Sequence, residues 1–280
     1  MTNESITPPA AEPAAVAAAA NEELWRGLLL GTDPRYARAR AWLKHVPSEP
    51  RCKMCAAPFG GVGRPLMRFL HRDPWAKNPL YCTLCFNVLQ AHHGGAEIEA
   101  SFLFADVRGS TALAEGISPT EFRRQLNRFY DTASRILVEH DAIVDKFVGD
   151  EVIGLFIPAL AHDEHAAQAV EAARALLRAT GHADPGGPWI PIGVGVHTGV
   201  AFIGSVGKPP VTDLTALGDV VNTTARLASA AATGEILITE EAAAAASVET
   251  ASLERRDLEL KGKSVATAVF VATVGKAAAA

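Results

Sequence analysis

Hydrophobic residues between positions 98 and 275 follow two spacings that alternate along the chain. Short apolar runs, such as "ASFLFADV" at 100–107, are typical of buried strands. The segment 118–140, "SPTEFRRQLNRFYDTASRILVEH", instead has apolar residues every three or four positions, which predicts an amphipathic helix facing a sheet. Ser118, Pro119 and Glu121 supply a cap, a first-turn proline and a carboxylate that reaches back, so they mark the start of this helix.

The same alternation continues to the C-terminal side. Residues 142–157, "AIVDKFVGDEVIGLFI", predict a hairpin with its turn at "VGDE". The later expectations are helices at 162–180 and 218–231 and strands at 190–199, 200–207 and 235–239. Strands alternating with helices in this order predict an α+β fold in which a sheet is layered with helices.

The N-terminal third has a different pattern. Residues 1–20 are rich in Ala and Pro and predict a disordered tail, and 276–280 form a second one. Two short helices are expected within 21–46, followed by a cysteine-rich stretch and a Gly-Gly break near Glu97. We therefore divide the chain into a module at 21–97 and a larger domain at 98–275.

Composition narrows the choice of protein class. The chain is 49% hydrophobic, which is enough for a buried core, and its formal net charge is -5, which makes nucleic acid an unlikely partner. No stretch has the length of a membrane-spanning helix, and the N-terminus lacks a secretory signal. We expect a cytoplasmic protein, without a membrane partner, whose cysteines stay reduced.

Two aspartates stand at predicted strand ends. Asp106 ends the strand at 100–107, and Asp150 lies at the tip of the hairpin. If the two strands are neighbours, the carboxylates meet at one edge and favour divalent cations. The alternative is two unrelated surface aspartates in turns, which are common positions for this residue.

The segments around these aspartates resemble the class III nucleotidyl cyclases. The motifs are "FLFADVRGSTAL", "DKFVGDEVIGLF", "GVHTGVAFIGSVG" and "DLTALGDVVNTTARLASAA", in the order and at the spacing seen in that family. The resemblance covers roughly Ile98 to Val274. It implies a ferredoxin-like catalytic core that works as a head-to-tail homodimer, with its nucleotide in the interface.

The resemblance also assigns roles to single residues. Asp106 and Asp150 match the aspartates that hold two Mg2+ or Mn2+ ions in each active site. The remaining matches are Lys146 and Thr215 for the purine, Asn222 and Arg226 for the ribose and the transferring phosphate, and Lys261, with Lys263 nearby, for the polyphosphate. Asn222 and Arg226 are four residues apart, so they share one helix face.

The purine-reading residues indicate which base is used. Lys146 can donate to adenine N1, and the Thr215 hydroxyl can accept from the adenine amino group. Many family members have Asp where this chain has Thr215, so weaker discrimination against GTP stays open. The threonine variant resembles a subgroup in which some members respond to bicarbonate.

These residues together predict an adenylate cyclase that converts ATP to 3',5'-cyclic AMP and pyrophosphate. The enzymatic alternative is a guanylate or mixed-specificity cyclase. The non-enzymatic alternative is a signalling module that only binds nucleotide, but Asp106, Asp150, Asn222 and Arg226 are all present.

The four cysteines of the chain form two Cys-x-x-Cys pairs, Cys52 with Cys55 and Cys82 with Cys85. This spacing allows two thiolates of each pair to bind one metal ion, and four sulfur ligands favour tetrahedral zinc. An iron-sulfur cluster and thiol redox chemistry are the alternatives. We expect the module to regulate or assemble the catalytic domain rather than to carry the reaction.

Overall fold

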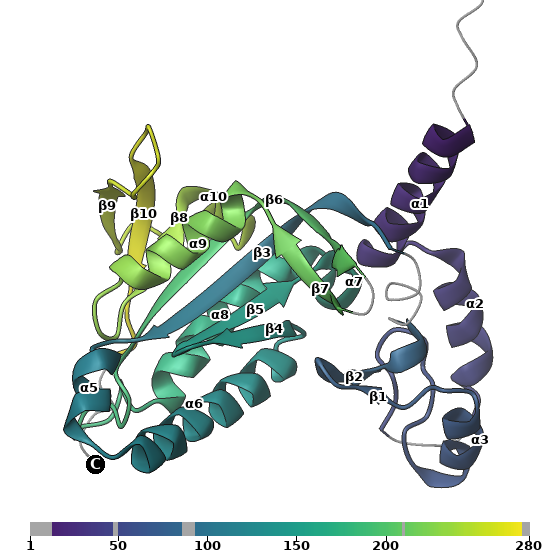
Figure 1. The fold of residues 1–280 in the computed structure, drawn as a ribbon, viewed down its shortest axis with the longest axis horizontal. Helices are drawn as coiled ribbons and strands as arrows, with labels where there is room; N and C mark the ends of the chain where they lie inside the picture. The colour runs from purple at the N-terminus through teal and green to yellow at the C-terminus, as the bar shows by residue number, and fades with distance from the viewer. Residues whose placement is uncertain (1–12, 47–49, 86–92, 209–210, 276–280) are drawn as a thin grey trace, which may run out of the picture.

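A mixed eight-stranded sheet forms the centre of the computed structural model, which describes residues 13–46, 50–85, 93–208 and 211–275 (Figure 1). The strand order is β4-β5-β3-β6-β8-β10-β9, and β7 pairs with β6 beside this path. Neighbours are antiparallel except β6 and β8, which run parallel. The bounds are β3 Gly95–Val107, β4 Ile143–Val148, β5 Glu151–Phe156, β6 Ile192–Lys208, β7 Val211–Leu217, β8 Ile236–Thr239, β9 Glu254–Leu258 and β10 Thr267–Ala272.

Helices cover both faces of this sheet. The side chains of β3 alternate between two hydrophobic clusters, because successive residues of a strand point to opposite faces. Leu103 packs toward α6 and α8, whereas Phe102 and Phe104 belong to the cluster that includes α9. The helices of this part are α5 Ser110–Gly116, α6 Pro119–Glu139, α7 Pro158–Ala161, α8 His165–Ala179, α9 Asp219–Ala230 and α10 Glu240–Ala245, with the short 3-10 turn η2 His162–Glu164. The α+β expectation is confirmed.

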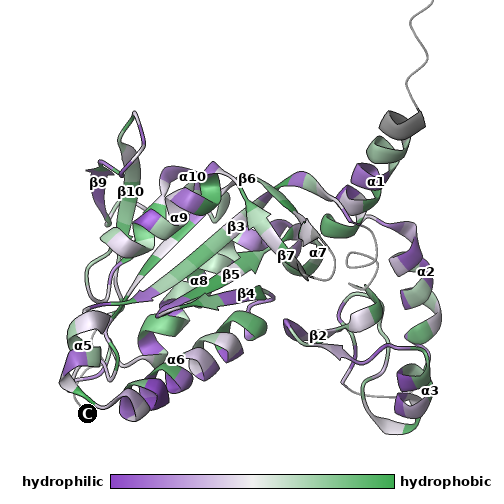
Figure 2. Ribbon diagram, viewed as in Figure 1, coloured by the Kyte–Doolittle hydropathy of each residue, from purple (hydrophilic) through white to green (hydrophobic). Residues whose placement is uncertain are grey.

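Helix α6 has the amphipathic character expected from its sequence. The Ser118 side chain accepts a hydrogen bond from Glu121 N at 3.2 Å and so caps the helix. The buried residues are Phe129, Ala133, Ile136 and Leu137, and Figure 2 shows the polar side of the helix turned away from the sheet. Burial of this face fixes α6 against the hairpin of β4 and β5.

Two segments differ from expectation. Residues 190–199 and 200–207, predicted as two strands, form the single strand β6, because Gly199 stays in the ladder opposite Ala100 instead of turning. Helix α1, Pro13–Leu29, begins inside the predicted tail, so residues 13–20 are helical. Alanine has high helix propensity, and burial of Trp25 and Leu29 anchors the C-terminal part of this helix.

The cysteine module lies at the end of the molecule that α1 and α2 Pro34–Leu43 occupy (Figure 1). It contains η1 Gly61–Gly63, α3 Arg64–Phe69 and a small hairpin of β1 Pro74–Trp75 and β2 Asn78–Cys82. Its buried residues join the same hydrophobic cluster as one face of the sheet.

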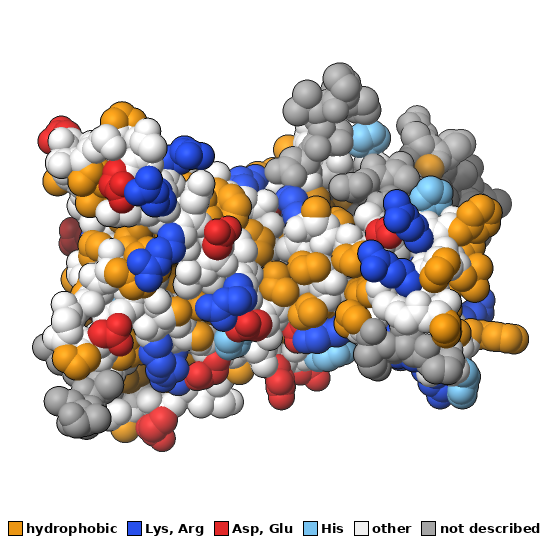
Figure 3. All heavy atoms as spheres, turned by 90° about the horizontal axis from the view of Figure 1, so that it is seen from below, with side chains coloured by type: hydrophobic (Ala, Val, Ile, Leu, Met, Phe, Trp, Pro, Cys, Tyr) orange, Lys and Arg blue, Asp and Glu red, His pale blue; other side chains and the backbone are white. Residues whose placement is uncertain are grey.

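The outer side of the module carries exposed hydrophobic side chains, and Figure 3 shows such side chains at this end of the molecule. They include Val62 and Phe69, which are 82% and 81% exposed. The buried residues of the module belong to the cluster that it shares with the sheet, so this contact and the cysteine cluster must supply much of the module's stability.

No helix within the described ranges is long and apolar enough to cross a membrane.

Candidate active site and cysteine cluster

Asp106 and Asp150 lie where β3, β4 and β5 meet. Asp106 pairs in register with Glu151 of β5, and Asp150 occupies the tight turn between β4 and β5 after Gly149, which has φ +62. Val107 N donates to Asp150 O at 3.4 Å. Antiparallel pairing of β3 with β5 thus brings the two strand ends together, the condition on which a shared cation site depends.

The electrostatics of this edge are set by several groups besides the two aspartates. Arg108 forms an ion pair with Asp106, and its Nη1 donates to Ser229 O at 2.7 Å near the end of α9. Burial, reinforced by the negative charge of Asp150, raises the pKa of Glu151 to about 7, while Arg108 acts in the opposite direction. Carboxylate oxygens are ligands that Mg2+ and Mn2+ prefer, so the residues at this edge fit a divalent cation.

Lys146 and Thr215 are brought together by the fold. Lys146 Nζ on β4 donates to Thr215 Oγ1 on β7 at 2.9 Å, although the two residues are 69 positions apart. Thr215 is 8% exposed, and its hydroxyl donates to Asp145 Oδ2 at 3.0 Å. A cationic donor and a hydroxyl thus lie side by side, as hydrogen bonding to one edge of a base requires.

Asn222 and Arg226 lie on α9, which rests directly on the sheet. A Cβ on Gly195 of β6 would approach the backbone of α9 to 2.7 Å, so glycine is needed there for the helix to come this close. Asn222 is exposed and Arg226 is half-buried. In the part of the chain that the structure describes, no carboxylate pairs with Arg226, which leaves its guanidinium charge available to a ligand.

Lys261 is near this helix through its neighbour Gly262. A Cβ on Gly262 would lie 3.4 Å from Arg226 Nη2, which places the turn containing Lys261 beside the guanidinium. The Lys263 side chain instead forms an ion pair with Asp219 at the start of α9. Of the two lysines, Lys261 is therefore the one whose exposed ammonium is not engaged by a carboxylate among the described residues.

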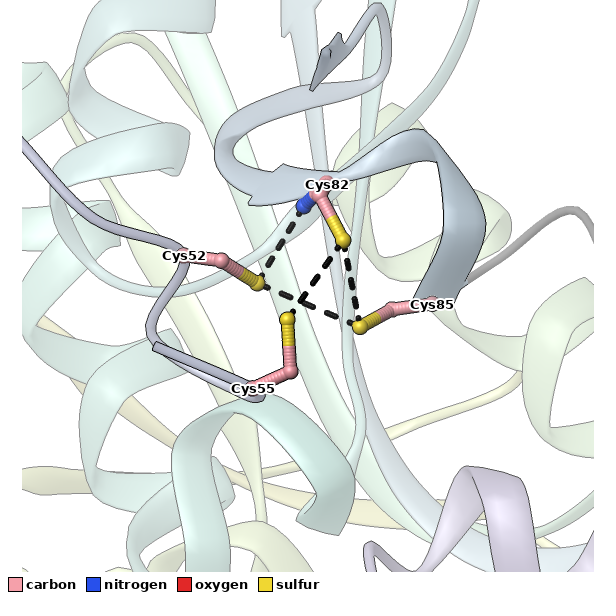
Figure 4. A group of neighbouring side chains, drawn as sticks. All are labelled: Cys52, Cys55, Cys82 and Cys85. Carbon is pink, nitrogen blue, oxygen red and sulfur yellow. Dashed lines mark hydrogen bonds between the residues drawn. The ribbon is translucent and has the colours of Figure 1, made fainter. Parts of the chain in front are cut away.

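The four cysteines are all buried and converge on one point (Figure 4). Their sulfur atoms lie within 4.8 Å of one another, with Cys82 and Cys85 at 3.4 Å, Cys55 and Cys82 at 3.6 Å and Cys52 and Cys85 at 4.0 Å. Four thiolates around one ion with bonds of about 2.3 Å would lie about 3.8 Å apart. A disulfide requires about 2.05 Å, so the distances fit a single tetrahedral ion.

Two hydrogen bonds from outside the thiol groups favour thiolates at Cys55 and Cys52. Arg72 Nη1 donates to Cys55 Sγ at 3.2 Å, and Cys82 N donates to Cys52 Sγ at the same distance. Hydrogen bonding from the Cys55 side chain holds the pKa of Cys52 below its usual value, whereas hydrogen bonding with Cys52 raises the pKa of Cys85. Thiolates are the form of cysteine that binds metals, so this buried cluster could hold a metal ion.

The sequence of residues 96–273 matches the family described as the adenylate and guanylate cyclase catalytic domain. The match runs from β3 to β10 and includes the candidate active-site residues from Asp106 to Lys261. The chain belongs to this cyclase family. The cysteine module precedes the matched residues.

Curated relatives of this chain include two bacterial adenylate cyclases. Adenylate cyclase 1 of Rhizobium meliloti is 34% identical over 144 residues, which are 49% of this chain and 22% of that protein. Adenylate cyclase of Anabaena cylindrica is 31% identical over 186 residues, which are 61% of this chain and 36% of that protein. The matches thus span about a quarter to a third of the length of these relatives.

Solved structures with this fold include cyclases for both purines. The adenylyl cyclase CyaB from P. aeruginosa has a TM-score of 0.55 and 27% identity, covering 65% of this chain and 97% of that one. The guanylyl cyclase Cya2 has a TM-score of 0.56 and 28% identity, covering 65% and 95%. Overall similarity therefore does not decide between the two bases.

Three residues at the candidate site were missed by reasoning from the sequence. Asp145, Lys77 and Arg108 contact Thr215, Asp145 and Asp106 respectively. Arg108 follows Asp106 by two positions, so alternation along the strand offered a signal for it. Asp145 is adjacent to Lys146, and alternation would place the two on opposite faces; the register shift between Val144 and Lys146, which the sequence did not reveal, lies at this point of β4. Lys77 lies in the cysteine module, far from the catalytic motifs along the chain, and no local signal pointed to it.

Proposed function

We propose that this chain is an adenylate cyclase, which converts ATP to 3',5'-cyclic AMP and pyrophosphate. The observation that carries the choice of base is the contact between Lys146 and Thr215 at 2.9 Å. It supports a site with an obligate donor for adenine N1 next to an oxygen that can accept from the adenine amino group.

Each remaining residue has a role in this proposal. Asp106 and Asp150 would hold two Mg2+ or Mn2+ ions, which lower the pKa of the ribose 3'-hydroxyl and neutralise the leaving pyrophosphate. Asn222 orients the ribose, and Arg226 places its rigid guanidinium where charge develops on the transferring phosphate. Lys261 binds the polyphosphate.

We further propose that two copies of the chain build the site in head-to-tail fashion. One copy supplies the two aspartates, and the other supplies Lys146, Thr215, Asn222 and Arg226. In support, neither aspartate bonds to Asn222 or Arg226 within the described part of the chain, whereas Lys146 and Thr215 contact each other in one copy. The homodimer would then contain two equivalent sites.

The cysteine cluster is proposed to hold one structural Zn2+ and to make the module a regulatory element of the cyclase. The four sulfur atoms lie within 4.8 Å of one another, and three of the pairs are 3.4 to 4.0 Å apart, which supports a single ion. In a four-iron cluster each cysteine binds a different iron atom, so the four cysteine sulfurs lie farther apart than they do around a single ion. A mononuclear iron site shares the tetrahedral sulfur geometry, and visible absorption of the purified protein separates it from zinc.

The test of the main proposal is cyclic nucleotide formation by the purified chain. ATP and GTP are supplied separately with Mg2+ or Mn2+, over a range of protein concentrations. We expect cyclic AMP as the main product, with activity that rises more than linearly with protein because the site needs two chains. Formation of mainly cyclic GMP would support the second candidate function, a guanylate cyclase. The similarity to the guanylyl cyclase Cya2 favours this candidate.

A further inference from the structure

The turn between β1 and β2 of the cysteine module reaches the purine-reading residues, and Figure 1 shows this hairpin next to β4. Lys77 O accepts from Val144 N at 3.2 Å, and Asn78 Nδ2 donates to Ala142 O at 2.6 Å. Both bonds tie the turn to the start of β4. The module is thereby fixed within two residues of Lys146 along that strand.

Asp145 is the meeting point of these groups. Its Oδ1 is 3.3 Å from Lys77 Nζ, and its Oδ2 accepts from Thr215 at 3.0 Å and lies 3.5 Å from Lys146 Nζ. Lys77 Nζ also donates to Leu214 O at 2.9 Å, directly before Thr215. The Asp145 side chain is only 7% exposed, so its position is set by these contacts rather than by water.

This arrangement fixes the direction of the Thr215 proton. A carboxylate flanked by two ammonium groups only accepts hydrogen bonds, so the single hydroxyl proton of Thr215 points to Asp145. The lone pairs of Thr215 then face Lys146 and the space where the base is expected. An acceptor there suits the amino group of adenine, whereas the carbonyl oxygen of guanine would meet lone pairs and leave a buried acceptor unsatisfied.

We infer that Asp145, held by Lys77 of the cysteine module, is a positioning residue that makes Thr215 an acceptor and so sets the preference for ATP over GTP. This inference rests on the proposed function. It also connects the module physically to the candidate active site, since Lys77 lies in the turn directly before β2, the strand that ends at Cys82.

The experiment compares ATP with GTP in two ways for each variant. One is the ratio of kcat/KM for cyclisation, and the other is the ratio of Kd for the two nucleotides with Ca2+ in place of Mg2+. In Asp145→Ala, the Thr215 proton is released and can be donated to guanine, so we expect the ATP preference to fall about tenfold in both ratios.

Two further variants locate the effect. Lys77→Met should lower the preference by about threefold, because Asp145 loses one of its restraints. Lys53→Met is the matched control: Lys53 Nζ pairs with Asp141 Oδ1 at 2.5 Å and also joins the module to the catalytic domain, but away from the base. Its ratios should equal those of the wild type. If Asp145→Ala fails to fold, the comparison of Lys77→Met with Lys53→Met still tests the inference.

A double-mutant cycle separates positioning from a merely structural role. In a Thr215→Val background there is no hydroxyl to orient, so adding Asp145→Ala should leave both ratios unchanged. An unchanged ratio in Asp145→Ala alone, or an equal change with and without the hydroxyl, overturns the inference. Selective binding without any cyclic product would instead overturn the proposed function, while the Kd ratios still test Asp145.

Discussion

The cysteine cluster and the catalytic residues are held in place by different means. The cluster draws its four sulfur atoms from two Cys-x-x-Cys pairs, and these atoms lie within 4.8 Å of one another. The proposed catalytic and nucleotide-binding residues come from β3, β4, β7, α9 and two turns, and the packing of the sheet and its helices brings these elements together. We therefore expect loss of a cysteine to damage structure first, and loss of a catalytic side chain to damage chemistry alone.

The largest expected effect lies in the catalytic region. Asp150→Ala and Arg226→Ala should each reduce cyclisation by about a thousandfold without lowering the melting temperature, because each removes charge stabilisation but little packing. Asp131→Ala, an exposed aspartate on α6, should retain full activity.

Mixing these two inactive variants sharpens the comparison. Heterodimers of Asp150→Ala and Arg226→Ala chains would contain one site with all its residues, so activity should return on mixing. Absence of recovery in dimers shown to have exchanged subunits contradicts the shared site.

The second effect belongs to the module. Cys82→Ser should abolish tight metal binding and lower thermal stability by several kcal/mol, about 3–5, because three buried thiols lose their common ion. Metal analysis together with melting curves in the presence and absence of a chelator checks this. A variant that melts like the wild type and still carries one equivalent of metal would show that the cluster is not the ligand set.

A smaller effect separates the two lysines of the C-terminal turn. Lys261→Ala should raise KM for ATP about tenfold, since an ammonium that addresses the polyphosphate is lost. Lys263→Ala removes only an exposed pair with Asp219 and should change KM less than twofold. Steady-state kinetics with ATP measure the two KM values. A larger increase in KM for Lys263→Ala than for Lys261→Ala would assign the phosphate contact to Lys263.

The smallest effect concerns stability against acid. Burial lowers the pKa of His165, whose Nδ1 is 2.9 Å from Ser101 Oγ. The unfolded chain binds this proton below about pH 6.5 and the folded chain does not, so stability is lost as the pH falls from there toward the folded pKa.

His165→Asn should therefore lose less stability than the wild type between pH 7 and pH 5 in denaturant titrations. The raised pKa of Glu151 acts with the opposite sign in both proteins, so it cancels in this difference. Equal losses in the two proteins would show that His165 does not titrate on unfolding.

Local patterns predicted much of the fold. The cap at Ser118, the apolar stripe of α6 and the hairpin turn at Gly149 are consequences of short-range chemistry, and all are present. The division between Gly199 and Val200 was wrong, because a glycine that would end a strand in isolation is retained by pairing with β3 on one side. Pairing across the sheet is not visible in a single segment.

The sequence by itself determined the family, through linked motifs, and the residues that each motif contributes. It also determined the cysteine pairs, since Cys-x-x-Cys spacing is a local property. Only the tertiary structure decided which of these residues touch. Lys77, Asp145 and Thr215 are separated by 68 and 70 positions, yet they form one chain of contacts. Such contacts depend on how β4, β7 and the module pack, and packing is a property of the whole chain.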